Sequence, residues 1–323
     1  MRSKLTTVTA AVLIASSAML MTACNDKDTT KGTPVSTVSG TPLGGANQPG
    51  GTDKTGGTDK TGGSNSQATV RTIGKTGWYE GFEISVDKAT VTPDGSGGAS
   101  VRVDMTFKNT TTKDATPSVI PDIQIDGAIS PGTGFDMPDV PGKGSAAGDV
   151  TTSVKKLDSA EHLLDTVTVV FGTSADNQTK IPLKADAKAD SVAPKTLNVS
   201  GKLVQDQTTV EITGGTLTPS YVKGERNKMN LALHIKLVGG SGIGGGGLNV
   251  FTEDFSLKMP DGQTVVADNR GFIDELLDRN QTIDKADLFA VFVVPAPATG
   301  NYVVSYDATK GASATPTYAF TVN

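Results

Sequence analysis

The sequence is poor in the residues that carry most protein chemistry. Its 323 residues include one cysteine and two histidines, and aromatic residues make up 5% of the chain. A single cysteine excludes an intrachain disulfide and a site built from several thiolates. His162 and His234 lie far apart, and neither Gly-x-Ser-x-Gly nor His-Glu-x-x-His occurs. We therefore expect a non-enzymatic protein without catalytic residues, metal ligands or cofactor, although an unrecognised pair of carboxylates is left open.

The N-terminal apolar run is too short to cross a membrane. It covers residues 10–21, whereas a spanning helix needs roughly 20 apolar residues. Arg2 and Lys4 precede the run, and the small residues Thr22 and Ala23 end it. A positive start, a short apolar core and a small-residue end predict a secretory signal peptide over residues 1–23.

The only cysteine, Cys24, follows this signal directly. The segment from Met21 to Cys24 resembles the lipobox of bacterial lipoproteins, in which an aliphatic residue and two small residues precede a cysteine. The resemblance implies cleavage between Ala23 and Cys24 and attachment of diacylglycerol to the sulfur of Cys24. Two acyl chains are what stable anchoring requires. We expect a protein held at the cell membrane by this lipid, facing the extracellular or wall side.

Basic residues are also scarce in the expected mature chain. Without Arg2 and Lys4 it has 27 lysines and arginines against 34 acidic residues. Nucleic-acid binding depends on cations that neutralise phosphates, and no basic cluster is present. The composition therefore excludes nucleic acid as a partner. The partners that remain are the membrane, which the protein contacts through its lipid, and an envelope protein or wall component.

Residues 24–68 contain almost nothing that can form a core. The segment 51–56 reads Gly-Thr-Asp-Lys-Thr-Gly, and 57–62 repeats it letter for letter. Such a tract buries too little apolar surface to offset the entropy lost on ordering. We predict a disordered Gly/Thr/Ser-rich linker that spaces the folded part from the membrane.

The region 69–184 has the pattern of a first antiparallel β-sandwich. Its clearest strand runs from Val101 to Phe107, where apolar and polar residues alternate. The Gly/Pro-rich stretch 130–148 is expected to be a loop. A single helical turn is expected over 159–165, with Ser159 as its cap and His162 solvated.

A second β-sandwich is predicted over 196–323, after an interdomain linker over 185–195. Its clearest strand runs from Met229 to Leu237. Thr216 to Pro219 repeats the pattern of Thr90 to Pro93 at a displacement of 126 residues, which indicates two divergent copies of one unit. A helix is expected over 271–279.

The order of these elements resembles a known family. The segment Phe82 to Asn109, the strand Met229 to Leu237 and the segment Phe289 to Pro295 are similar to telokin-like, immunoglobulin-type extracellular domains of Gram-positive lipoproteins. The resemblance implies an all-β chain with two immunoglobulin-like antiparallel sandwiches after a signal peptide and a disordered linker. The family has no settled activity, and so no catalytic residue is carried over.

Three local features have competing interpretations. The glycine-rich stretch 239–247 lacks the following helix and lysine of a nucleotide loop, and a strand is expected after it. The acidic residues of 268–278 favour either a capped helix or a calcium site. Trp78 and Tyr79 serve either as an aromatic sugar platform or as packing at the end of a sandwich, with packing favoured.

These observations predict a membrane-anchored, extracytoplasmic binding or interaction module of the cell envelope. The alternative is a lipoprotein that binds carbohydrate or a small solute and assists a wall enzyme or transporter. The two differ in what the folded part should expose. A protein partner predicts an apolar patch or an unpaired strand edge, whereas a sugar site predicts an exposed Trp78 beside polar groups.

Overall fold

The computed structural model describes residues 67–130 and 134–323. The predicted signal peptide, the lipid site at Cys24 and nearly all of the predicted linker lie outside the described residues. The described part contains one α-helix among many strands, all paired antiparallel. The all-β fold class is therefore confirmed. No helix in these residues is long and apolar enough to span a membrane.

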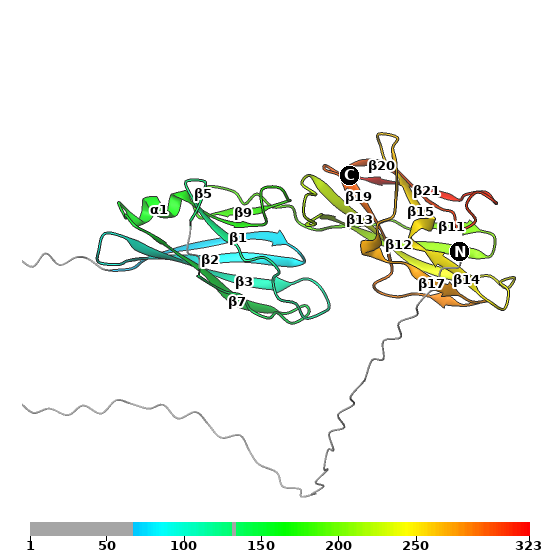
Figure 1. The fold of residues 1–323 in the computed structure, drawn as a ribbon, viewed down its shortest axis with the longest axis horizontal. Helices are drawn as coiled ribbons and strands as arrows, with labels where there is room; N and C mark the ends of the chain where they lie inside the picture. The colour runs from blue at the N-terminus through cyan, green and yellow to red at the C-terminus, as the bar shows by residue number, and fades with distance from the viewer. Residues whose placement is uncertain (1–66, 131–133) are drawn as a thin grey trace, which may run out of the picture. The chain divides into compact units, whose positions relative to one another are not determined.

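The N-terminal half, residues 69–183, holds nine strands and the helix α1 (Figure 1). In chain order these elements are β1 (Thr69–Tyr79), β2 (Phe82–Pro93), β3 (Ala99–Asn109), β4 (Asp122–Ile125), β5 (Ala128–Ile129), β6 (Gly134–Asp136), β7 (Ser145–Val154), α1 (Ala160–Thr166), β8 (Val167–Phe171) and β9 (Thr179–Pro182). They form two sheets, of order β1-β2-β3-β7-β6 and β5-β4-β8-β9.

The C-terminal half, residues 195–322, holds the remaining elements and three sheets, of order β10-β12-β13-β18 with β11 and β19 joining, β16-β15-β20-β21, and β14-β17. The elements are β10 (Lys195–Leu197), β11 (Gly201–Gln205), β12 (Thr208–Pro219), β13 (Lys228–Gly239), β14 (Leu248–Phe251), η1 (Thr252–Asp254), β15 (Phe255–Lys258), β16 (Thr264–Val266), η2 (Asn269–Gly271), β17 (Asp274–Leu277), β18 (Thr282–Ile283), β19 (Phe289–Pro295), β20 (Gly300–Tyr306) and β21 (Thr317–Val322).

Each half buries its own hydrophobic cluster, made from the inward side chains of its strands. Along β3, Val101, Val103 and Phe107 are fully buried while their polar neighbours face out. In β13 the same alternation buries Leu231 and Leu233. A period of two over a long strand buries one face and leaves the other wet, as the sequence predicts.

The two halves repeat a three-stranded unit in the same register. The hairpin β1–β2 pairs Thr69 with Val91, and the equivalent pair in the second half is Lys195 with Leu217, displaced by 126 residues. The bounds of β12 are those of β2 displaced by the same 126 residues. Both long strands also shift register at one site, between Val86 and Lys88 and between Ile212 and Gly214. The internal repeat inferred from the sequence is present in the structure.

The described residues belong to one compact unit. The predicted linker 185–195 forms no extended strand before β10, although Asp190 bridges Lys180 of β9 through two backbone hydrogen bonds of 2.9 Å. The structure therefore shows two cores and several sheets inside one unit. The division into two immunoglobulin-like sandwiches stays a prediction.

Two local expectations are wrong. The predicted helix over 271–279 is instead η2 followed by β17, because the backbone there pairs with β14. The predicted loop over 130–148 contains β6 and the start of β7, where small residues pair along the edge of β3. The helical turn after Ser159 is confirmed as α1, and the Ser159 side chain accepts a hydrogen bond from the backbone of His162.

Candidate interaction surface

The strands β14 and β17 form a two-stranded sheet that lies at the surface of the C-terminal half (Figure 1). Phe251 of β14 pairs with Asp274 of β17, and Asn249 pairs with Leu276. Paired residues of antiparallel strands point to the same face, and side chains alternate between faces along each strand. These four side chains therefore share the outer face of the sheet.

This outer face carries large apolar side chains in contact with solvent. Phe251 is 37% exposed, Leu276 is 51% exposed, and Phe272, two residues before Asp274, is 69% exposed. Because Phe251 lies opposite Asp274, Leu276 is its diagonal neighbour on this face. Phe272 lies just before β17, where η2 ends, two residues from Asp274. We call Phe251, Phe272 and Leu276, which surround Asp274, the outer patch.

The inner face explains why this sheet stays in place. Val250 and Leu277 are fully buried, and Ile273 is 2% exposed. The pairing continues beyond β14, because the Thr252 N–H donates to the carbonyl of Ile273 at 2.9 Å and the Thr252 hydroxyl accepts from the Ile273 N–H at 2.7 Å. The apolar residues of the inner face therefore hold the outer patch at the surface on a rigid support.

Arg270 fixes the turn that presents Phe272. Its guanidinium donates to the Asp268 carboxylate at 2.8 Å, to both Glu225 oxygens at 3.0 and 3.1 Å, and to the Asn230 side-chain oxygen at 2.7 Å. Arg270 lowers the pKa of both carboxyls, Glu225 and Asp268, through these hydrogen bonds. Its planar fork thereby ties η2 to the loop before β13.

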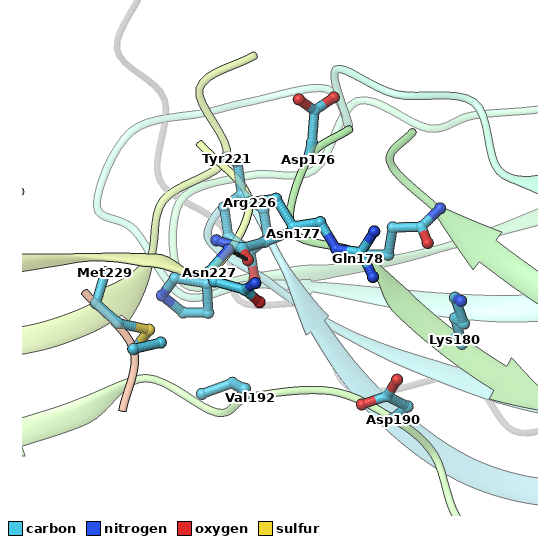
Figure 2. A pocket seen from close by; sticks show the side chains of 12 residues that line it. Asp176, Asn177, Gln178, Lys180, Asp190, Val192, Tyr221, Arg226, Asn227 and Met229 are labelled. Atoms are coloured by element: carbon cyan, nitrogen blue, oxygen red, sulfur yellow. Dashed lines mark hydrogen bonds between the residues drawn. The ribbon is translucent and has the colours of Figure 1, made fainter. Parts of the chain in front are cut away.

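A polar pocket of about 220 Å³ lies elsewhere, between residues 176–192 and 219–229 (Figure 2). Figure 2 shows Met229 at one end and Lys180 with Asp190 at the other. Amide side chains line its middle, those of Asn177, Gln178 and Asn227. Such a mixture of amides, charges and a small apolar wall suits a neutral or zwitterionic polar ligand.

Asn177 is used mainly to hold the walls of this pocket together. Its amide nitrogen donates to the carbonyls of Ser220 and Lys228 at 2.7 and 2.8 Å, and its oxygen accepts from the Asn227 N–H at 2.9 Å. The neighbouring Asp176 accepts from the Gly224 N–H at 2.6 Å. The pocket therefore has a preformed frame.

Burial and hydrogen bonds shift the pKa values near this frame. The Thr173 hydroxyl and the Gly224 N–H lower the pKa of Asp176. Burial raises the pKa of Tyr79 to about 12 and also raises that of Tyr221, whose ring lies 4.4 Å from Tyr79. Asp176 is therefore ionised and both phenols are neutral at pH 7. These states suit hydrogen bonding rather than proton transfer.

The structure separates the two histidines and accounts for each. His162 is exposed on α1. His234 lies on β13, where Nδ1 is 2.5 Å from the Thr213 hydroxyl and Nε2 is 2.9 Å from the carbonyl of Lys285. Both ring nitrogens of His234 therefore have protein partners.

Trp78 is half-buried in β1, next to the buried Tyr79. Its backbone carbonyl accepts from the hydroxyls of Thr179 and Tyr221 at 2.5 and 3.1 Å. The residue is therefore built into the end of the N-terminal half, as the packing interpretation expects. It does not present the fully exposed ring that a sugar platform requires.

The acidic stretch 268–278 does not converge on a metal. Among the described residues there is no group of three or more His, Cys, Asp or Glu side chains that could hold an ion. Asp268 binds Arg270, and Glu275 pairs with Lys285 at 2.5 Å. After the glycine-rich stretch 239–247 the chain continues as the strand β14, as predicted, and not as the helix that a nucleotide loop needs.

The outer patch was not predicted from the sequence. Read as a helix, residues 271–279 place Ile273, Leu276 and Leu277 on one buried stripe. Read as a strand, they place Ile273 and Leu277 inside and Leu276 outside. The sequence Phe-Ile-Asp-Glu-Leu-Leu at 272–277 has no period-two alternation of apolar and polar residues, and so it contains no strand signal to outweigh the helical pattern.

Comparisons with known proteins do not assign the chain to a family. No family model matches the chain, and no curated protein matches it. Among solved structures, a protein from Bacillus anthracis described as a conserved domain protein matches 79% of this chain and 91% of its own, at 10% identity and a TM-score of 0.23. A TM-score this low carries no information about a shared fold or function.

Proposed function

We propose that the chain is a lipid-anchored, extracytoplasmic protein that binds another envelope protein and does not catalyse a reaction. The observation that carries this proposal is the outer patch, three large apolar side chains exposed together on one face. The membrane address comes from the lipobox-like sequence before Cys24. The repeat at 126 residues supports a tandem of telokin-like, immunoglobulin-type sandwiches as the folded part.

The size of the outer patch favours an interface. At about 200 Å² for each large apolar side chain, the three exposed fractions amount to roughly 300 Å². At about 25 cal/mol per Å², covering this area contributes roughly 8 kcal/mol before the cost of association, itself about 4–15 kcal/mol. The patch therefore supports binding only together with further polar contacts. The largest apolar patch on a monomeric protein is typically about 300–600 Å² and often functional.

In-cell photo-crosslinking tests this proposal. A photoreactive amino acid is placed at Phe272, and the matched control carries it at Phe135, an exposed aromatic residue of β6 in the N-terminal half. We expect one dominant protein adduct from position 272 and none of that mass from position 135. Identical adducts from both positions, or capture of wall polymer alone from position 272, would contradict the proposal.

The second candidate is a carbohydrate- or solute-binding lipoprotein, which the pocket of Figure 2 favours. Gln178 and Lys180 line this pocket, and neither side chain belongs to the Asn177 frame. Calorimetric titration with wall glycan fragments and amino acids tests this function. Binding that is lost in Gln178→Ala and Lys180→Ala but kept in Asp274→Asn would place the ligand in the pocket and not at the outer patch.

A further inference from the structure

Asp274 lies at the centre of the outer patch. It is opposite Phe251 on the neighbouring strand, and Phe272 and Leu276 flank it at two residues on either side. The Asp274 side chain is exposed and forms no hydrogen bond or ion pair with any described residue. A carboxylate among exposed apolar side chains is an unusual surface. The charge disfavours a purely apolar partner, and the apolar side chains disfavour a purely polar one.

The cations near Asp274 are already engaged. Lys285 pairs with Glu275, the inward-facing neighbour of Asp274. Arg270 binds Asp268 and Glu225, while the Arg279 Nε donates to a backbone carbonyl at 3.0 Å. The surrounding segment 248–280 contains seven acidic residues against three basic ones. The charge at the centre of the patch is therefore left for a partner.

The sheet beneath the patch also has open edges. In the described part of the chain, β14 pairs only with β17, and β17 only with β14. The Thr252 N–H donates to the Ile273 carbonyl, and along antiparallel strands such inward-bonded positions alternate with positions whose backbone groups point outward. The backbone groups of Asn249 and Leu276 therefore point away from their partner strand, toward these edges. An unpaired edge is a template for an added strand.

We propose that the outer patch binds an extended protein segment that places a lysine or arginine on Asp274 between apolar side chains. The proposal rests on the proposed function and specifies its partner. The partner's apolar side chains cover Phe251, Phe272 and Leu276, and its backbone pairs with an open edge of the β14–β17 sheet. Covering the patch removes water from the ion pair and so strengthens it.

Charge complementarity favours this occupant over three others. A second copy of the chain would bring one acidic segment against another across a two-fold axis. An anionic membrane surface would be repelled by the same acidic residues. The chain's own segment 25–66 has only Val35, Val38 and Leu43 as large apolar residues, and so it cannot cover the patch.

Titration with three labelled peptides tests the inference. Each has eleven residues that alternate leucine and threonine around a central lysine, glutamine or glutamate. The protein is the mature chain with Cys24→Ser, and fluorescence anisotropy gives Kd at low and high salt. We expect the lysine peptide to bind about fivefold more tightly than the glutamine peptide, with the glutamate peptide weakest, as for one part-exposed ion pair. High salt should reduce this preference.

Variants of Asp274 then assign the preference to one side chain. Asp274→Asn should abolish the preference for lysine, and Asp274→Lys should invert it toward the glutamate peptide. Asp136→Asn is the matched control, because Asp136 is an exposed carboxylate beside the exposed Phe135 on β6. It should leave the order of affinities unchanged.

Several results would overturn the inference. One is binding of none of the peptides up to millimolar concentration, and another is a lysine preference that survives Asp274→Asn. A third is tighter binding of all peptides by Asp274→Asn together with self-association, which would make Asp274 a charge that protects the strand edge. If crosslinking from Phe272 still captures one partner in cells, only the chemistry of that partner is refuted. If that capture also fails, the proposed function fails with it.

Discussion

Replacing Arg270 by methionine tests how the turn beside the outer patch is held. The Arg270 side chain is 22% exposed, and its two carboxylate partners, Glu225 and Asp268, are 24% and 36% exposed. Methionine keeps much of the aliphatic packing but removes every donor. The substitution therefore isolates the guanidinium and its hydrogen bonds to the two carboxylates, to Asn230 and to the Ser220 hydroxyl.

The expected loss follows from the number and exposure of these bonds. Hydrogen bonds to charged groups contribute about 1.5–3 kcal/mol when buried, and exposed ion pairs about 0.2–1 kcal/mol. Because Glu225 and Asp268 are partly exposed, the interaction of each with Arg270 should contribute about 1 kcal/mol to the free energy of unfolding. The hydrogen bond to Asn230 should add about 0.5–1 kcal/mol. Arg270→Met should therefore lower the free energy of unfolding by about 2–3 kcal/mol at pH 7.

The loss should depend on pH in a defined direction. Arg270 holds the pKa values of Glu225 and Asp268 below their ordinary values of 4.5 and 3.8. Groups with a depressed folded-state pKa contribute stability above the unfolded-state pKa, and that stability is lost as pH falls through the folded-state pKa. The difference between wild type and Arg270→Met should be complete above about pH 5 and smaller at about pH 2.5.

Urea denaturation followed by far-ultraviolet circular dichroism measures this difference, because the single tryptophan lies in the other half of the chain. Arg279→Met is the control, since the only hydrogen bond found for the Arg279 side chain among the described residues goes to the carbonyl of Ile243. It should cost less than about 1 kcal/mol at either pH. An Arg270→Met penalty below about 0.5 kcal/mol at pH 7, or one of equal size at both pH values, would refute the reasoning.

Three further predictions concern the anchor, the linker and the core. Cys24→Ser should abolish metabolic labelling with a fatty acid and release or stall the protein; a variant that stays labelled would exclude the lipid site. Deleting residues 25–68 should leave the melting temperature of the folded part within about 2 °C, and a drop of many degrees would mean that this segment is structured. Leu231→Ala, at a fully buried position, should cost about 2–5 kcal/mol, whereas Leu276→Ala should stay within about 0.5 kcal/mol in urea denaturation; similar losses would place Leu276 in the core.

The long strands could be predicted because their pattern has a single interpretation. Eight or more residues with period two in β3 and β13 fit no helical stripe. The similarity between the segments that begin at Thr90 and Thr216 covers only four residues. The strand pairing nevertheless shows that β2 and β12 are equivalent strands with the same register shift. Repetition of the same strand bounds and the same register shift is stronger evidence than either alternating strand alone.

No pattern in the sequence predicts the pocket of Figure 2. Its walls come from residues near 177 and near 227, about 50 positions apart. Each wall is a polar turn of ordinary composition. Only the tertiary packing brings the Asn177 amide to the carbonyls of Ser220 and Lys228, and that packing leaves no local periodicity in either segment.

The wrong helix over 271–279 bears on the outer patch. Asp-Glu-Leu-Leu at 274–277 consists mainly of good helix formers and includes no β-branched residue. These residues are nevertheless held as β17 by pairing with β14 and by the Arg270 network at η2. A local preference overridden by the global fold is more common at functional sites than elsewhere. At β17 the fold overrides that preference to place Phe272 and Leu276 in water beside an unpaired Asp274. Because stability alone favours burying these side chains, the conflict is a further reason for the proposal that this face binds a partner.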